Sequence, residues 1–148
     1  NIVSIEMFEA VGKKYWHNYF DTIRNSLNDN GMAALQVITI DEKKAKDYQN
    51  RPDFIQQYIF PGGMLPTKKE LLEINNKAGL DFKEIKSFGL SYAKTLNLWN
   101  TQFQNSWNDL VKLGFNHRFK RMWEFYLAYC ETGFISQSTD VSHFLITK

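Results

Sequence analysis

Two glutamates, Glu6 and Glu9, directly follow a short run of β-branched residues in this sequence. The run, residues 2–5, predicts a strand that is buried on both faces. In an open α/β sheet, ligands bind outside the carboxyl ends of the strands, where a carboxylate can bind a polar group or hold a base. Alternatively, both glutamates lie on the first turn of a helix and only interact with its dipole. The sequence leaves both interpretations open.

Gln36 is a second candidate, because it lies in the middle of the otherwise apolar segment 32–40. That segment predicts another buried strand, and a buried amide without hydrogen-bond partners costs about 1–3 kcal/mol. Gln36 therefore belongs either to a polar site or to a hydrogen bond with a neighbouring loop. A third candidate is the loop F-P-G-G-M-L-P at residues 60–66, whose prolines and glycines make a stiff turn. For this loop the chemistry favours a structural turn.

Several kinds of site find no support in the sequence. It contains no glycine-rich phosphate loop and no G-x-S-x-G nucleophile motif. His17, His117 and His143 are far apart, with no cysteine or second histidine at ligand spacing, so we expect no metal site and place each histidine at the surface or at a helix end. Cys130 lies on an apolar helix face and is expected to be an inert core residue. The basic and aromatic segment 116–121 favours a solvated helix face over a membrane or nucleic-acid patch.

The elements that must position these candidates alternate between strands and helices. Strands are predicted at residues 2–5, 32–40, 81–88 and 141–147. Helices are predicted at residues 13–27 and 52–59, after the capping-box pattern at 67–70, from 92 to 110 and after 116, with 43–49 as a surface excursion. The first strand, helix and strand form a βαβ unit, and the alternation predicts an α/β fold. Three to five strands are few for a doubly wound sheet, so we expect an N-terminal half to be missing.

Composition is that of a folded globular domain. The 148 residues are 43% hydrophobic and 23% charged, which excludes disorder over most of the chain. A net charge of +2 is too small to indicate nucleic-acid binding, and no apolar run is long enough to span a membrane. The single cysteine suits a reducing compartment. The 12 Phe, 7 Tyr and 4 Trp indicate either a heavily aromatic core or an apolar pocket.

Four long motifs, in this order, resemble one protein family. They are S-I-E-M-F-E-A-V-G at 4–12, Y-I-F-P-G-G-M-L-P at 58–66, F-G-L-S-Y-A-K-T-L-N-L-W at 88–99 and F-K-R-M-W-E-F-Y-L-A-Y-C at 119–130. Together they look like the C-terminal half of the cyclopropane-fatty-acyl-phospholipid synthase family, which also includes mycolic acid cyclopropane synthases and methyltransferases. The resemblance spans nearly all of the chain.

The resemblance implies that residues 1–148 are the C-terminal part of one class I methyltransferase domain, with a Rossmann-like sheet and helices on both faces. Family members transfer the methyl group of S-adenosylmethionine to the double bond of an unsaturated acyl chain, and a bicarbonate ion accepts the proton whose loss closes the cyclopropane ring. Carried over by motif, Glu9 matches the glutamate of the bicarbonate site, the backbone of Ile38 faces the ion, and Tyr92 closes the site. The cofactor loop is expected upstream, and Ile5 is the one residue here expected to contact the cofactor.

Two departures from the family pattern leave the reaction open. Gln36 stands where many bacterial synthases have His, and it can hydrogen-bond the ion but cannot take a proton near neutral pH. Glu6 stands where the family has Gly. Cyclopropanation, methylation of a different lipid chain and methylation of a small molecule or protein all stay open. A non-catalytic lipid-binding module is the alternative outside enzymes.

The resemblance also implies partners and a location. The expected partner is an unsaturated phospholipid acyl chain, reached by peripheral contact with the inner membrane surface from the cytoplasm, and no nucleic acid. If strands of an N-terminal half are missing, the strand at 2–5 or the strand at 32–40 leaves an unpaired edge. Because exposed edges promote pairing between chains, we expect a homodimer or another assembly that covers this edge.

Overall fold

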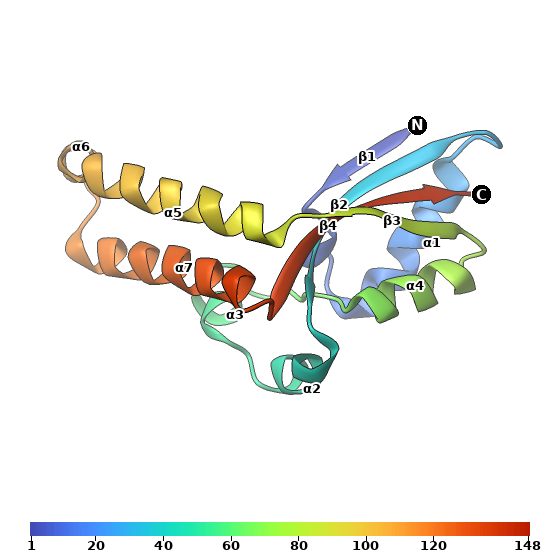
Figure 1. Cartoon of the computed structure of the whole chain (residues 1–148), viewed down its shortest axis with the longest axis horizontal. Helices are drawn as coiled ribbons and strands as arrows, with labels where there is room; N and C mark the ends of the chain where they lie inside the picture. Colours follow the sequence, from blue (N-terminus) through green and yellow to red (C-terminus); the bar gives the residue numbers. More distant parts are fainter.

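Four strands form one open sheet in the computed structural model, which describes all residues from 1 to 148 (Figure 1). The strands are β1 (Ile2–Ile5), β2 (Met32–Ile40), β3 (Asp81–Ser87) and β4 (Thr139–Thr147). They lie in the order β1-β2-β4-β3. β1 and β2 are parallel, whereas β4 runs antiparallel to both of its neighbours. The parallel pair, joined through a helix, confirms the predicted βαβ unit.

Short 3₁₀ turns and α-helices connect these strands. The 3₁₀ turns are η1 (Phe8–Ala10) and η2 (Lys13–Tyr15), and the α-helices are α1 (Trp16–Ser26), α2 (Glu42–Asn50), α3 (Phe54–Tyr58), α4 (Lys68–Lys77), α5 (Gly89–Asn105), α6 (Trp107–Lys112) and α7 (His117–Ile135). None of these helices combines the length and the apolar character that crossing a bilayer demands.

Most helix boundaries follow from local signals in the sequence. At the start of α4, the Thr67 side chain accepts a hydrogen bond from the Glu70 N–H, and the Glu70 carboxylate accepts one from the Thr67 N–H. This reciprocal pair confirms the predicted capping box. Asn116 caps α7 by accepting from the Phe119 N–H at 3.0 Å, again as its residue type predicts.

Two segments differ from the sequence predictions. Residues 43–49, expected as an excursion, lie within helix α2, whose first turn is capped by a hydrogen bond from the Lys43 N–H to the Asp41 carboxylate at 2.8 Å. The helix has almost no apolar face, so periodicity could not find it. The long helix expected through Leu110 is interrupted at Ser106. The turn there lets Trp107 become buried, with its ring 5.9 Å from that of Phe103.

The main hydrophobic core lies between one face of the sheet and helices α1 and α4. Alternate residues of β2, namely Ala33, Leu35 and Val37, are buried in it, as the two-residue period of a strand requires. From β4, Phe144 and Ile146 join them on the same face. This face carries no candidate site residue and serves stability.

The opposite face of the sheet carries helices only at one end. Helices α5 and α7 run side by side and project away from the sheet (Figure 1), and their inner residues pack around Ile38 and Val141. Val3 and Ile5 lie on this face and are 72% and 65% exposed. The prediction that the strand at 2–5 is buried on both faces is therefore wrong for this structure, because no helix covers β1 there. β1 is an edge strand and β2 has partners on both sides, so the unpaired edge is at the first of the two predicted positions.

One aromatic side chain connects the core to the end of β1. Phe8, in the turn η1, has no exposed surface, and its ring lies 5.2 Å from Trp16, 5.0 Å from Tyr19 and 5.2 Å from Phe20. These contacts fix the turn that follows β1. They also fix the position of the next residue, Glu9.

We expect Phe8→Ala to lower the free energy of unfolding by about 3–5 kcal/mol, because it removes a ring from a fully enclosed site and leaves a cavity. Phe8→Leu, which keeps most of the apolar volume, should cost clearly less. Urea denaturation followed by circular dichroism measures both. Equal and small losses in the two variants would show that Phe8 does not anchor the turn.

Candidate functional site

Glu9 is held at the carboxyl ends of β1 and β2 by hydrogen bonds from two other segments. Its carboxylate Oε1 accepts from the Ile38 N–H at 2.6 Å, and its backbone carbonyl accepts from the Met64 N–H at 2.8 Å. The second bond comes from the loop 60–66, in which Gly62 has a φ of +84°. The loop is therefore the structural turn that its sequence favours, and it also fixes Glu9.

The Glu9 carboxyl group is an unusual acid. Burial raises its pKa to about 7, and the hydrogen bond from Ile38 only partly opposes this effect. The second oxygen, Oε2, is buried and has no hydrogen-bond partner. A buried carboxyl group with one free oxygen and a pKa near neutrality is typical of a site that handles charge or protons.

Glu6 lies beside Glu9 and takes part in a second set of hydrogen bonds. Its Oε1 accepts from the Gln36 side-chain amide at 2.6 Å and from the hydroxyl group of Tyr92. Burial, followed by the contact with Glu6, raises the pKa of Tyr92 above its ordinary value, so the hydroxyl group remains a donor. Glu6 has a φ of +49°, a left-handed conformation that residues other than glycine rarely adopt.

His143 extends this set of hydrogen bonds onto the next strand. It faces Gln36 across the antiparallel pair β2–β4, and its Nε2 lies 2.9 Å from the Gln36 carbonyl oxygen. Because the amide nitrogen of Gln36 donates to Glu6, its oxygen is left to accept, so Nε2 of His143 carries the proton. The imidazole ring also packs edge-on against Phe88, with centroids 4.6 Å apart. His143 is exposed, so the prediction that it lies at the surface is confirmed, and its contact with Gln36 through strand pairing is a feature that the sequence did not predict.

The structure brings four of the five predicted site residues together. Glu9 and Ile38 are hydrogen-bonded to each other, and Gln36 and Tyr92 share the Glu6 carboxylate. Ile5 lies next to them at the end of β1, and its side chain is largely exposed on the same face. The sequence marked Glu6 as a carboxylate at a strand end but gave no sign of its partners. The contact between His143 and Gln36 depends on the register in which β4 pairs with β2, and the sequence does not reveal that register.

Aromatic side chains of α5 and α7 extend from this cluster. The rings of Tyr92 and Phe134 are 5.2 Å apart, and Trp123 and Tyr126 are 5.0 Å apart. Burial raises the pKa of Cys130 to about 12, so its thiol stays protonated, in agreement with the predicted inert residue. The aromatic excess is thus divided between the core around Phe8 and this second region along the helix pair.

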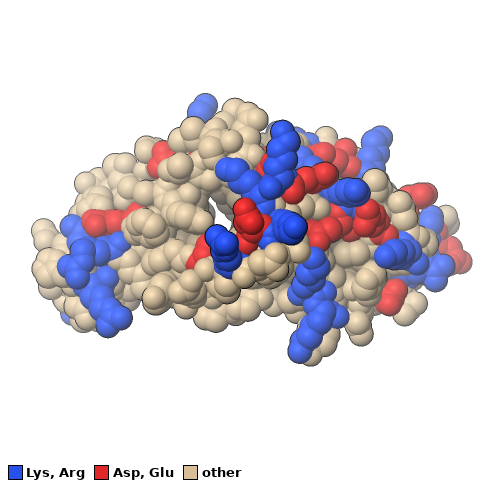
Figure 2. All heavy atoms as spheres, turned by 90° about the horizontal axis from the view of Figure 1, so that it is seen from below, with Lys and Arg blue, Asp and Glu red and all other residues tan.

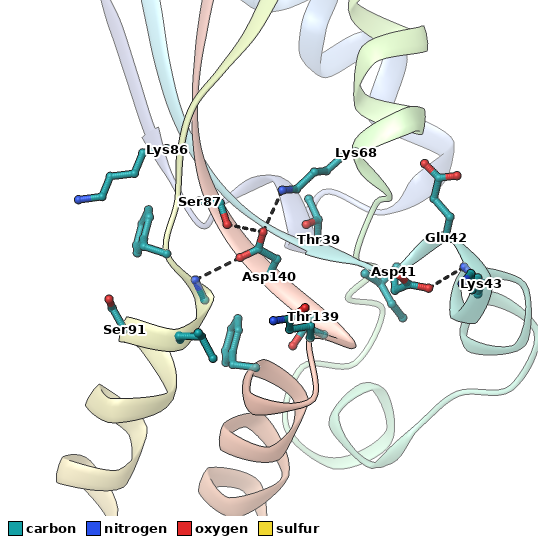
Figure 3. Close-up of a pocket in the computed structure, with 16 residues that line it drawn as sticks. Thr39, Asp41, Glu42, Lys43, Lys68, Lys86, Ser87, Ser91, Thr139 and Asp140 are labelled. Carbon is teal, nitrogen blue, oxygen red and sulfur yellow. Dashed lines mark hydrogen bonds and ion pairs between the residues drawn. The ribbon is translucent and has the colours of Figure 1, made fainter.

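A separate cavity of about 780 Å³ opens beside the start of α5 and the start of β4 (Figure 3). Asp140 lines this cavity. Its carboxylate accepts hydrogen bonds from Lys68 at 2.8 Å, from Ser87 at 2.6 Å and from the Gly89 N–H at 3.1 Å. Burial by itself would raise the pKa of Asp140, but Lys68 and Ser87 hold it below its ordinary value. Because these charges satisfy one another, the cavity offers a structural network and not a reactive group.

The chain contains no group of three or more His, Cys, Asp and Glu side chains placed to hold a metal ion. The chemistry available at the candidate site is therefore that of two adjacent carboxyl groups, an amide, a phenol and an imidazole. Carboxylates can stabilise a cation or accept a proton, and the aromatic faces nearby can also stabilise positive charge.

Comparisons with known proteins show the family to which this chain belongs. The sequence model of the family described as mycolic acid cyclopropane synthetase matches residues 1–144. Tuberculostearic acid methyltransferase of Mycobacterium tuberculosis is 38% identical over 149 aligned positions, which cover 100% of this chain and 35% of that protein. Cyclopropane-fatty-acyl-phospholipid synthase of Escherichia coli is 33% identical over 133 positions, covering 90% of this chain and 33% of that protein.

A solved structure gives the same result for the fold. The crystal structure of a mycolic acid cyclopropane synthase in complex with SAH and CTAB superimposes with a TM-score of 0.89 at 28% identity, covering 99% of this chain and 54% of that one. This match confirms the predicted α/β class I methyltransferase fold. The chain spans between about a third and about half of the length of these relatives.

The raised pKa of Glu9 predicts how the free energy of unfolding depends on pH. Its folded-state pKa of about 7 lies above its ordinary value of 4.5, so the folded state favours the protonated acid. This contribution is fully present below pH 4.5 and is lost as the pH rises through 7. Between pH 5 and pH 8 the free energy of unfolding should fall by about 2–3 kcal/mol through this group.

Glu9→Gln should abolish that loss, because a glutamine accepts from the Ile38 N–H but does not ionise. Urea denaturation of both proteins at pH 5 and pH 8 measures the difference. Glu73→Gln, on an exposed side chain of α4, is the matched control and should follow the unsubstituted chain. Parallel pH dependences for the Glu9 variant and the unsubstituted chain would contradict the raised pKa.

Proposed function

Because this chain belongs to the mycolic acid cyclopropane synthetase family, we propose that it is the C-terminal part of a single S-adenosylmethionine-dependent methyltransferase domain. The proposed reaction transfers a one-carbon unit to the double bond of an unsaturated acyl chain of a phospholipid. The observation that carries the proposal is the cluster of Glu6, Glu9, Gln36 and Tyr92 at the carboxyl ends of β1 and β2. That edge of an α/β sheet is where ligands bind.

The side chains of the cluster suit a reaction that develops positive charge. S-adenosylmethionine supplies an electrophilic methyl group, and its transfer to a double bond leaves a cationic carbon. Fixed carboxylates close to that carbon stabilise it without having to reorganise. The faces of Tyr92 and Tyr126 can add about 0.5–2 kcal/mol each. A non-catalytic lipid-binding module would have no need for two carboxyl groups in this position.

The proposed substrate is an unsaturated acyl chain of a phospholipid. The relatives named above include a tuberculostearic acid methyltransferase and a cyclopropane-fatty-acyl-phospholipid synthase. One is thus named for methylation and the other for formation of a cyclopropane ring. The aromatic and apolar side chains along α5 and α7 offer a surface that suits an acyl chain. A methyltransferase acting on a different substrate is the alternative, and the molecule that carries a labelled methyl carbon after the reaction separates the two.

Peripheral contact with a membrane belongs to the same proposal. Val111, Leu113 and Phe115, at the tip of the helix pair, are 48%, 76% and 39% exposed. Arg118 and Arg121 follow them closely in the sequence and are exposed, and Figure 2 shows a group of Lys and Arg side chains at the end of the molecule where α6 lies. Exposed apolar residues flanked by basic ones suit an anionic lipid surface.

The unpaired edge of β1 is the position at which we propose that the rest of the domain adds its strands. Ile5 lies at this edge and is the one residue that we assign to cofactor contact, so most cofactor contacts fall to the half that precedes residue 1. In the 148-residue chain by itself, pairing of two β1 edges would give the homodimer that the sequence predicts.

We expect the 148-residue chain to bind S-adenosylmethionine weakly or not at all, because it has no glycine-rich loop and no acidic residue placed for the ribose. Calorimetry tests this directly. The full-length protein, in contrast, should bind the cofactor and transfer a labelled methyl group to unsaturated phospholipid vesicles. Gain of one CH₂ in the acyl chain, read by mass spectrometry, indicates one-carbon transfer, and replacement of the alkene proton signals by cyclopropane signals in the NMR spectrum of the product indicates ring closure. Micromolar binding by the 148-residue chain would mean that the cofactor site is misplaced.

In the full-length protein, Glu9→Gln should reduce turnover by about 10²-fold or more, while changing the affinities for cofactor and lipid much less. The substitution keeps the hydrogen bond from Ile38 and removes the negative charge that Glu9 carries when it is ionised, so turnover is compared at pH 8, above the Glu9 pKa of about 7. Glu73→Gln serves again as the control. Turnover of the Glu9 variant within about threefold of the unsubstituted enzyme, far above that 10²-fold loss, would remove Glu9 from the site.

A further inference from the structure

We propose that the Glu6 carboxylate is the proton acceptor of the reaction and stands in place of a free bicarbonate ion. The inference rests on the proposed function and changes one part of it. The family resemblance puts bicarbonate among Glu9, Gln36, Ile38 and Tyr92, but the arrangement of these groups does not fit that ion.

Every hydrogen-bond donor expected to hold the ion is already used by a carboxylate of the chain. The Ile38 N–H donates to Glu9 at 2.6 Å, the Gln36 amide donates to Glu6 at 2.6 Å, and the Tyr92 hydroxyl group donates to Glu6. A carboxylate has the same planar pair of oxygens as bicarbonate and accepts the same hydrogen bonds. Glu6 therefore satisfies the donors that would otherwise bind the ion.

Charge opposes a third anion at this position. Glu6 and Glu9 are close enough for Glu6 to help raise the pKa of Glu9. No lysine or arginine forms an ion pair with either carboxylate. Bicarbonate would thus meet two acidic side chains and no compensating cation, which disfavours its binding.

The backbone at Glu6 supports a chemical role for its side chain. A φ of +49° costs a residue with a side chain about 1–2 kcal/mol more than it costs glycine, the residue that the family pattern has here. Strain of this kind persists where the surrounding structure holds it, and it gathers at functional sites. Here the hydrogen bonds from Gln36 and Tyr92 hold the side chain, and His143 fixes the orientation of the Gln36 amide.

The proposed step balances. Methyl transfer breaks the bond between the cofactor sulfur and the methyl carbon and forms a carbon–carbon bond to one alkene carbon. The other alkene carbon is left cationic. Loss of a proton from the new methyl group then supplies the electron pair that closes the three-membered ring. Both hydrogen bonds to Glu6 use Oε1, so Oε2 is free to accept that proton, which afterwards passes to water.

The first test measures bicarbonate binding by the 148-residue chain, using ¹³C-bicarbonate and the broadening of its NMR signal. The unsubstituted chain should cause no saturable broadening. Glu6→Gly frees the Gln36 and Tyr92 donors and relieves the left-handed strain, so this variant should fold and should bind the ion. Glu6→Gln fills the same space and should not bind it. Saturable binding by the unsubstituted chain, or no gain in Glu6→Gly, would overturn the proposal.

The second test follows turnover of the full-length enzyme with and without added bicarbonate. The unsubstituted enzyme should change by less than about twofold, while Glu6→Gly should lose about 10²-fold without bicarbonate and recover at least about tenfold with it. Glu6→Gln should be slow in both conditions. A large loss on removing bicarbonate from the unsubstituted enzyme would refute the role of Glu6. If no enzyme form transfers methyl groups, the proposed function fails, and the binding measurement still decides whether Glu6 occupies the ion's position.

Discussion

The hydrogen bond from the Ile38 N–H to Glu9 is the contact on which the candidate site depends. It joins the turn after β1 to the end of β2, and it uses a backbone donor that the sheet leaves free. Phe8 fixes the turn from the core side, and Met64 fixes it from the loop 60–66. An ionisable group is thereby kept largely out of water, and the raised pKa of Glu9 reflects the cost of charging it there.

The two faces of the sheet differ in what they carry. The face covered by α1 and α4 is closed and apolar, and it resembles any small α/β core. The other face presents Ile5, Gln36, Ile38 and His143 in adjacent positions, because Ile5 and His143 are the strand partners of Gln36 and because alternate residues of one strand share a face. The helix pair α5 and α7 brings Tyr92 over the same place. The candidate site and the hydrophobic core are therefore formed by alternate residues of the same strands.

The sequence alone was sufficient for the parts of this arrangement that depend on local chemistry. The strand at Met32–Ile40, the capping box at Thr67 and the turn at 60–66 each follow from residue type and spacing. What could not be predicted depends on pairing between distant segments. His143 meets Gln36 only because β4 pairs with β2 in one register, and Glu6 meets Tyr92 only because α5 crosses the end of the sheet. Helix α2 was not predicted for a different reason, since its residues are too polar to show the periodic apolar face of a helix.

The position of β4 in the sheet has a consequence for how the chain folds. β4 is the last strand in the sequence, yet it lies between β2 and β3 and is the only partner that β3 has. Met32 pairs with Thr147, so this contact closes a loop that contains most of the chain. During synthesis the sheet must stay open until Thr139–Thr147 have left the ribosome, and β2 meanwhile exposes an apolar edge. The sheet should therefore form slowly and only after β4 has been synthesised. A chaperone that shields β2 would have to stay bound until β4 pairs with it.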